Sequence, residues 1–275
     1  MTACGAALFG HVTDRIVNFY GTGKNGKGTL LRTLFFILGT YAAALPRGVV
    51  LKEPGQGSRF DLGGLPGKRA AICFDLKPDR AWLNLDVLKS IAGNGDPIFV
   101  EKKGKDGYSE VLKCKIFLAS NDKIPIDSFG ESEKRRFCLV PFNAHAEAVD
   151  EMLEARFIPE YEKILNLFIE YAVKYYANGR KMPPCKAIDT ATADYFDSQD
   201  IIGQFLKDSE AFTKADYEPK TAFYTKFEEY CGFQQGIRRP MKAKTFTNEL
   251  EKRGIFETVK KIDGKATRVF LRKVT

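Results

Sequence analysis

A glycine-rich segment between residues 21 and 29, GTGKNGKGT, constrains the fold of this chain more than any other part of the sequence. It follows a short β-prone run at 16–20 and precedes residues 29–41, where apolar side chains recur at helical spacing. Glycines at 21 and 26 allow the backbone to wrap around an oxyanion, while successive N–H groups and a helix N-terminus point at phosphate oxygens. The order of strand, glycine loop and helix therefore predicts a site that binds the phosphates of a nucleotide.

The residues expected to hold the nucleotide are small or polar, apart from one lysine. They are Gly21, Gly23, Asn25, Gly26, Lys27, Gly28 and Thr29. Lys27 can reach the β- and γ-phosphates of ATP. The strict pattern of such loops has Ser or Thr at position 28, where the hydroxyl binds Mg²⁺, but this chain has glycine there. Thr29 must then supply the hydroxyl, or Mg²⁺ is held in another way.

Polar residues also stand at the ends of other predicted strands. Asp75 directly follows an apolar run, where a carboxylate can hold Mg²⁺ or its waters. Asn121 follows a later apolar run and can orient the attacking water, although a lone Asn at a strand end is more often a turn former. An Arg pair before a further strand can offer a guanidinium to phosphate, as an arginine finger does. The predicted catalytic residues are Lys27, Asp75, Asn121, Arg135 and Arg136, with Thr29 and Asp75 as metal ligands.

The first half of the chain alternates apolar runs typical of buried strands with helical patterns and loops. This alternation predicts an α/β fold with a mostly parallel sheet covered on both faces. From about 147 to 178 the apolar spacing is helical, and a Lys-Met-Pro-Pro sequence at 181–184 then interrupts it. We therefore expect an ATPase core at 1–145, a helical segment and linker at 146–182, and a smaller domain at 183–275.

The last forty residues are strongly basic. Residues 236–275 contain twelve Lys or Arg and four acidic residues, so this segment carries an excess equal to the formal charge of +8 on the whole chain. A polyanionic partner such as DNA or RNA fits this distribution, and so does a basic face that contacts only solvent.

The same region has the pattern of a small helical domain that ends in a hairpin. Helical spacing is found near 199–208, 219–231 and 243–253, and a two-strand hairpin is expected to turn at Asp263-Gly264. Helix, helix and hairpin is the order of a winged-helix domain, which we therefore predict at the C-terminus.

Five motifs follow one another over residues 5 to 142: GTGKNGKGT, ICFDLKPD, LKSIAGNGDPIFVEKKGKDG, KIFLASNDKIP and EKRRFCLVPF. Together they resemble the motifs of superfamily 3 helicases of the phage and plasmid primase-helicase type. The resemblance implies an AAA+-like P-loop NTPase. In it, these segments would be Walker A, Walker B, a B-prime segment with a DNA-contacting hairpin, the sensor Asn and the arginine finger. The tail is similar to the winged-helix domain appended to many such proteins.

By that resemblance, the protein is expected to hydrolyse ATP with Mg²⁺ and to move 3′ to 5′ on single-stranded or forked DNA. It would act as a homo-oligomer, a hexamer, alongside other replication proteins, and Lys89 would lie near the nucleotide or a subunit interface. The expected DNA-binding residues are Lys102, Lys103 and Lys105 on the hairpin and Arg238, Arg239, Lys242 and Lys244 in the tail. A turn of glycine and lysine suits gripping of backbone phosphates, although a solvated turn has the same composition.

Several departures from the family pattern leave alternatives open. Gly28 replaces the usual serine, Asp75 stands where glutamate is common, and no second adjacent acid marks a catalytic base. The sequence GKGT is also carried by nucleoside monophosphate kinases, which makes a small-metabolite kinase one alternative. A non-motor, ATP-binding initiator or regulator of DNA replication is another. About 20 residues precede the glycine loop, so neither a primase domain nor a helical collar is expected in this chain.

Composition excludes some other classes. No stretch approaches the roughly 20 apolar residues that a membrane span requires, and the first ten residues lack a basic segment typical of secretory signals. Six cysteines lie far apart without a C-x-x-C pair, and two histidines accompany them. We therefore expect a cytoplasmic protein that contacts no membrane and has no zinc site or disulfide framework.

Overall fold

The computed structural model divides into two compact units, Met1–Phe196 and Asp197–Thr275. It describes residues 1–11, 14–52, 62–78, 81–93, 95–101, 106–126, 131–148, 150–212, 216–235 and 241–272. None of the helices within these ranges is long and apolar enough to cross a membrane.

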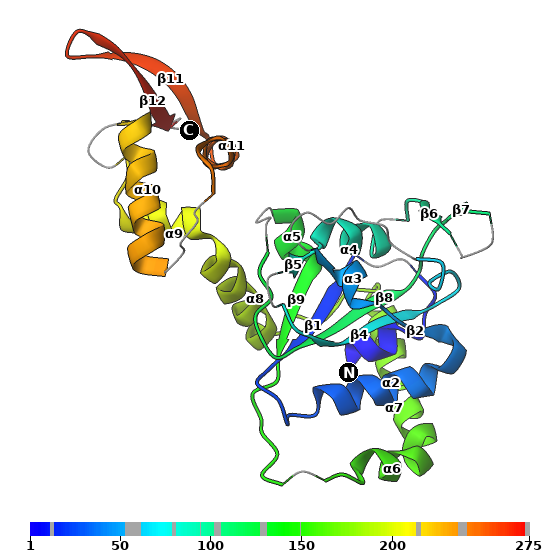
Figure 1. Cartoon of the computed structure of the whole chain (residues 1–275). Coiled ribbons are helices and arrows are strands. Elements are labelled where there is room, and N and C mark those ends of the chain that lie inside the picture. The colour runs from blue at the N-terminus through cyan, green and yellow to red at the C-terminus, as the bar shows by residue number, and fades with distance from the viewer. Residues whose placement is uncertain are drawn as a thin grey trace. The chain divides into compact units, whose positions relative to one another are not determined.

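The first unit is built on one parallel sheet (Figure 1). Its strands within the described residues are β1 (Ile16–Tyr20), β2 (Ala42–Ala44), β4 (Ala70–Leu76), β8 (Lys115–Ser120) and β9 (Phe137–Pro141). They lie in the order β2-β4-β8-β1-β9, and each neighbouring pair is parallel. The predicted α/β class with a parallel sheet is confirmed.

Helices cover both faces of this sheet, because successive residues of each strand point to opposite faces. On one face, Val17 and Phe117 pack against α1 (Thr2–Ala6), α2 (Lys27–Leu38) and α7 (Tyr161–Ala177). On the other, Ile16 and Ile116 pack against α3 (Arg47–Val50), α4 (Leu85–Ile91) and α8 (Lys186–Gln199). Figure 1 shows α2 and α7 on one side of the strands and α3 and α4 on the other.

The remaining elements of the first unit are short. They are η1 (Gly39–Tyr41), β3 (Leu51–Lys52), β5 (Trp82–Leu83), β6 (Ile98–Val100), β7 (Tyr108–Glu110), α5 (Glu131–Arg136), α6 (Leu153–Phe157) and η2 (Ile158–Glu160). The expected hairpin is present as the antiparallel pair β6–β7. Its second strand ends at Glu110. The residues of the predicted DNA-contacting turn, Lys102, Lys103 and Lys105, lie outside the described residues.

The second unit contains α9 (Ile201–Asp208), β10 (Tyr217–Pro219), α10 (Lys220–Gln235), α11 (Ala243–Glu251), β11 (Ile255–Ile262) and β12 (Lys265–Arg272). Its strands form an antiparallel sheet in the order β10-β12-β11. Aromatic side chains fill its core, with Phe205, Phe223 and Phe246 almost completely buried. The predicted turn is present, since both Asp263 and Gly264 have positive φ, as tight hairpins require.

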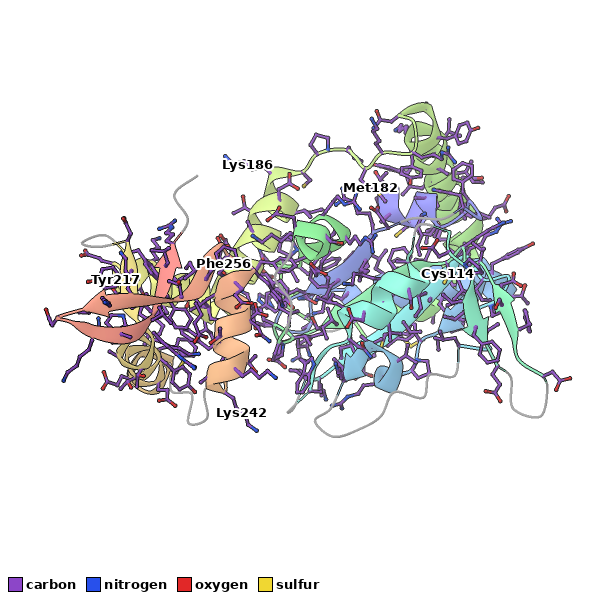
Figure 2. The ribbon with its side chains drawn as sticks, turned by 90° about the horizontal axis from the view of Figure 1, so that it is seen from above. Cys114, Met182, Lys186, Tyr217, Lys242 and Phe256 are labelled. Carbon is purple, nitrogen blue, oxygen red and sulfur yellow. The ribbon has the colours of Figure 1, made fainter. Side chains whose placement is uncertain are left out.

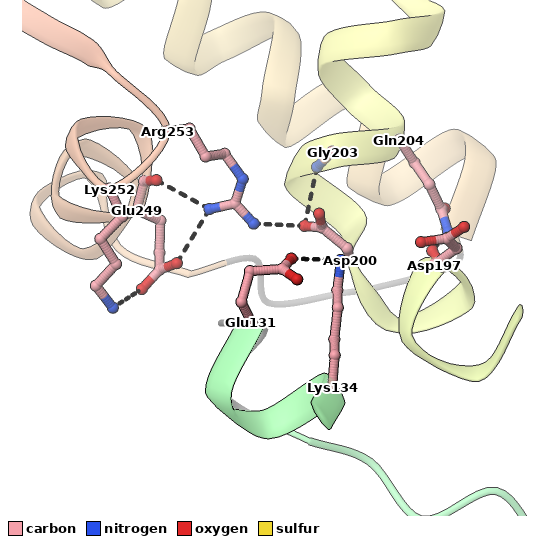
Figure 3. Close-up of polar contacts among 9 residues, drawn as sticks. All are labelled: Glu131, Lys134, Asp197, Asp200, Gly203, Gln204, Glu249, Lys252 and Arg253. Carbon is pink, nitrogen blue, oxygen red and sulfur yellow. Dashed lines mark hydrogen bonds and ion pairs between the residues drawn. The ribbon is translucent and has the colours of Figure 1, made fainter. Parts of the chain in front are cut away.

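One arginine links two helices of the second unit (Figure 3). The side chain of Asp200 caps α9 by accepting a bond from the Gly203 N–H (3.0 Å), and it also accepts one from Arg253 Nη2 (2.6 Å). Arg253 Nη1 donates to the backbone oxygen and the side chain of Glu249 in α11.

The division between the two units lies inside α8, not at the predicted 182/183 boundary. The segment around Met182 joins α7 to α8, which begins at Lys186 (Figure 2). The physical reason is the apolar end of α8: the Tyr195 ring stacks on Phe137 at a centroid distance of 5.2 Å, and its hydroxyl donates to the Ile124 carbonyl. The Pro-rich break therefore separates two helices that pack on the same core.

Helix α8 also contacts the last strand of the sheet. The backbone N–H of Leu139 in β9 donates to the hydroxyl of Thr192 (3.0 Å), so this strand finds a hydrogen-bond partner on its side away from β1. The predicted linker region 146–182 contains α7, which packs on α1 and the sheet and thereby belongs to the first unit.

Candidate functional site

A cavity of about 410 Å³ opens at the carboxyl ends of β1, β4 and β8, and we call it the β1–α2 cavity. In α/β sheets, this edge is where ligands bind. The lining residues are Gly23, Lys24, Asn25, Gly26, Lys27, Gly28, Thr29, Arg32, Phe74, Asp75, Ala119 and Asn121. The structure thus brings together four of the predicted functional side chains from three separate strand ends: Lys27, Thr29, Asp75 and Asn121.

The loop that leads from β1 into α2 depends on glycine at two positions. Gly26 is the N-cap of α2 with φ of 83°, a left-handed conformation that glycine adopts without steric cost. Gly21 has no room for a side chain, since a Cβ would lie 2.4 Å from the backbone oxygen of Phe142. The glycines therefore set the path of the backbone around the cavity.

Lys27 is held in place by two hydrogen bonds. Its Nζ donates to the Gly21 carbonyl (2.7 Å) and to Asn25 Oδ1 (2.8 Å), and the residue is 5% exposed. Asn25 is anchored in turn, because its Nδ2 donates to the Phe142 carbonyl (2.9 Å). Burial lowers the pKa of Lys27, while the carboxylate of Asp75 opposes this shift. Asp75 therefore acts electrostatically on the ammonium group from across the cavity.

Two non-glycine residues of the cavity have left-handed backbones. Asp75 has φ of 50° where the pairing of β4 with β8 is irregular, and Lys24 has φ of 48°. Such conformations are uncommon outside glycine and cluster at functional sites. The carboxylate of Asp75 is 63% exposed and lies 3.5 Å from Lys77 Nζ, so it remains accessible to a ligand.

Thr29 contacts an acidic residue that the sequence analysis did not single out. Its hydroxyl donates to Glu154 Oε1 of α6 (3.5 Å), and the same oxygen accepts a bond from Arg32 Nε (2.7 Å). Arg32 Nη2 also contacts this oxygen, and the guanidinium holds the pKa of the Glu154 carboxyl below its ordinary value. Three side chains thus form a cluster beside the first turns of α2.

The cavity also contains residues absent from the predicted site, namely Lys24, Arg32, Phe74 and Ala119. Helical spacing gives a signal for Arg32, because residues four apart lie on one face of a helix and Arg32 is four residues after Gly28. Glu154 has no comparable signal, since 122 residues separate it from Arg32.

The predicted arginine finger does not line the β1–α2 cavity. Arg135 and Arg136 end α5, and Arg135 Nη2 lies 3.3 Å from Asp14. Lys89 of α4 contacts Glu133 of α5 at 2.6 Å, so it too is engaged in the same chain and away from the cavity. A finger that acts on a neighbouring subunit need not face the cavity of its own chain.

Of the predicted DNA-binding residues in the tail, Arg238 and Arg239 lie outside the described residues, whereas Lys242 and Lys244 are exposed at the start of α11. The hairpin β11–β12 adds further exposed cations, at Lys260, Lys261, Lys265 and Arg268. The basic charge of the tail is thus carried on the surface of a folded unit.

Fold and cavity define an α/β protein with a glycine loop at the carboxyl edge of a parallel sheet. A family of unknown function (DUF5906) matches residues 19–136, which include the loop and the strands that carry Asp75 and Asn121. No curated protein sequence matches the chain.

Solved structures of the NrS-1 C-terminal region share the fold. An apo structure of its A form aligns with a TM-score of 0.56 and 15% identity, covering 98% of this chain and 71% of that one. A second apo structure of the region gives a TM-score of 0.55 and 16% identity, covering 98% and 70%. At this identity the similarity shows a common fold.

Proposed function

We propose that this protein is the motor of a replicative DNA helicase from a phage, plasmid or other mobile element, and that it hydrolyses ATP to translocate on single-stranded DNA. The observation that carries the proposal is the β1–α2 cavity, which collects Lys27, Thr29, Asp75 and Asn121 around a glycine loop. A lysine, a hydroxyl, a carboxylate and an amide are the groups that a P-loop ATPase applies to the β- and γ-phosphates.

Each group has a defined task in this proposal. Lys27 exchanges its bonds to Gly21 and Asn25 for bonds to phosphate oxygens. The existing bonds offset part of the cost of burying the ammonium group before nucleotide binds. Asp75 and the Thr29 hydroxyl would hold Mg²⁺ or its waters, and Asn121 would orient the water that attacks the γ-phosphate. The donor set fits Mg²⁺, which binds through one or two carboxylates together with substrate phosphates and waters. When bound, the ion would neutralise charge on the phosphates.

The second unit would supply a DNA contact. Its helices followed by a basic hairpin support a winged-helix domain, and the exposed Lys242 and Lys244 at the start of α11 are suited to phosphate contacts. The fold shared with the NrS-1 C-terminal region agrees with a common scaffold for both units. Assembly as a cytoplasmic hexamer, with Arg135 or Arg136 reaching a neighbouring cavity and with other replication proteins attached, completes the proposal.

The first prediction tests the motor directly. Lys27→Ala is expected to lower DNA-stimulated ATP hydrolysis at least 100-fold, because the phosphates lose the lysine, and to abolish unwinding of a forked duplex, without changing the thermal unfolding midpoint by more than a few degrees. The matched control is Lys163→Ala, which removes an exposed lysine of α7 paired with Glu160. Hydrolysis by the Lys27 variant at the wild-type rate would refute the proposal.

A second function keeps one supporting observation. Gly28 followed by Thr29 is also the sequence of nucleoside monophosphate kinases, so ATP could serve as a phosphoryl donor at the same cavity. Transfer to AMP or another monophosphate at a rate that DNA does not affect would favour the kinase. Salt-dependent DNA binding without strand separation would instead favour a non-motor initiator or regulator.

A further inference from the structure

The cavity contains a cation that the P-loop pattern does not include. Arg32 lies on α2 one turn after Gly28, and helical side chains tilt toward the N-terminus, so its guanidinium extends back over the first turn. A Cβ built on Gly28 would lie 3.0 Å from Arg32 Nη1 and 3.2 Å from Nη2. The guanidinium therefore lies close against the position that a side chain at residue 28 would enter.

Position 28 is where phosphate loops ordinarily carry the Ser or Thr hydroxyl that binds Mg²⁺. In this chain the positively charged guanidinium of Arg32 lies beside that position, because glycine has no side chain there. A guanidinium binds phosphate oxygens through a planar fork and is less strongly hydrated than an ammonium, so it is well suited to this task. It neutralises phosphate charge directly and does not act through the metal.

The bonds of Arg32 leave part of the fork available. Glu154 accepts from Nε and Nη2, while Nη1 is the guanidinium nitrogen nearest to Gly28. Glu154 also accepts from the Thr29 hydroxyl, so one carboxylate fixes both groups beside the cavity. The ion pair is about half exposed, and a nucleotide can reach it without unfolding of α2 or α6.

We propose that Arg32 binds the polyphosphate of a nucleoside triphosphate from the place usually occupied by the Mg²⁺-binding hydroxyl, and that the lack of a side chain at Gly28 gives the guanidinium room to do so. Glu154 positions the guanidinium before the nucleotide arrives. The inference rests on the proposed ATP site, whose phosphates Lys27 binds in the same cavity. It predicts that ATP binding depends on Arg32 and only weakly on Mg²⁺.

The test is calorimetric titration of the full chain with ATP, with and without Mg²⁺. Arg32→Ala is expected to raise the Kd for ATP about 10-fold or more, as loss of a charge-assisted bond does, and to change the Kd for AMP less than about twofold. Arg32→Lys keeps the positive charge but loses the planar fork, so its Kd for ATP should lie between those of the wild type and Arg32→Ala. Arg156→Ala is the matched control, since Arg156 is an exposed arginine of α6 paired with Asp150.

Substitution at position 28 gives an independent test of the same inference. Gly28→Ser displaces the guanidinium and should weaken ATP binding, and adding Arg32→Ala to it should restore affinity in a strictly Mg²⁺-dependent way, because the new hydroxyl binds the metal. Arg32→Ala with an unchanged Kd for ATP, while Lys27→Ala abolishes binding, overturns this inference alone. If the wild type binds no ATP, or if Lys27→Ala binds ATP as tightly as the wild type does, both the proposed function and this inference fail.

Discussion

At the scale of the residue, the glycine at position 21 shows how closely the loop is fitted to its surroundings. A Cβ there would meet two neighbours, the Phe142 carbonyl and the Asn25 amide, and the carbonyl belongs to backbone that cannot turn aside. The same two groups fix Lys27, because Asn25 bonds both to Phe142 and to the lysine. Crowding at Gly21 therefore disturbs the cavity and not just the loop.

Gly21→Ala should destabilise the protein by about 1–3 kcal/mol, the usual cost of overpacking, and should weaken ATP binding because Asn25 shifts. The comparison is Gly48→Ala in α3, where a Cβ would meet nothing within 4 Å and no loss of stability is expected. Chemical denaturation of both variants measures the difference. Equal stabilities would show that the close approach to Phe142 is not restrictive.

Lys115 is a buried cation at the start of β8. It is 2% exposed, its Nζ has no hydrogen-bond partner among the described residues, and Nζ lies 5.7 Å from the centroid of the Tyr175 ring. Burial lowers the pKa of Lys115 to about 8. A buried charge without a hydrogen bond costs stability, so this lysine weakens the fold at neutral pH.

Lys115→Met should therefore raise the free energy of unfolding by about 1–3 kcal/mol at pH 7. Between pH 8 and 10.5 the unfolded chain binds more protons at this lysine than the folded chain does, so wild-type stability gains as pH rises through this window. The advantage of the variant should accordingly shrink from pH 7 toward pH 10. Denaturant titrations at both pH values check this, and a gap that widens with pH would contradict it.

At the scale of the element, local sequence predicted much of the structure. The path from β1 through the loop into α2 follows from adjacent residues, as do the hairpin at Asp263-Gly264 and the helices of the second unit, because turn geometry and helical spacing are local. The end of β7 could not be predicted in this way, because the apolar Val111 follows directly while the pairing with β6 stops at Glu110. Strand limits depend on a partner that local sequence does not reveal.

The residues of the candidate site also fall into those that local sequence predicts and those that it does not. Lys27 and Thr29 could be predicted from the loop, and Asp75 and Asn121 from their positions after apolar runs, since parallel strands end at one edge. The contact of Arg32 with Glu154 could not be predicted, because it depends on how the segment after β9 returns to α2. Tertiary packing, not periodicity, brings that carboxylate to the cavity.

In the second unit, the contact between α9 and α11 is expected to depend on Arg253. Arg253→Ala removes its bonds to two partly buried carboxylates, so that Asp200 loses this cation and Glu249 keeps only Lys252, at a cost of about 1–3 kcal/mol. Amide hydrogen exchange should then accelerate in α9 and α11 more than in the parallel sheet. Lys252→Ala, which removes an exposed neighbour bound to the same glutamate, is the control and should change exchange little. Similar acceleration in both variants would exclude a special role for Arg253.

At the scale of the whole molecule, the chain has two compact units with separate cores. The first unit contains the cavity, and the second contains the basic segment that accounts for the net charge. The sequence predicted two domains but set their boundary at a proline pair, where helices end for local reasons. Burial of Tyr195 and Phe196 beyond that break extends the first unit, and such burial is visible only once β9 and α8 are packed together.

The hydrogen bond from Leu139 to Thr192 bears on solubility. An edge strand with free N–H groups is a template for strands of other molecules, and β9 is the last strand in its sheet. By occupying one of these groups and covering the strand with aromatic side chains, α8 obstructs β-sheet addition by a neighbouring chain. The helix that leads out of the first unit thus also protects it against aggregation.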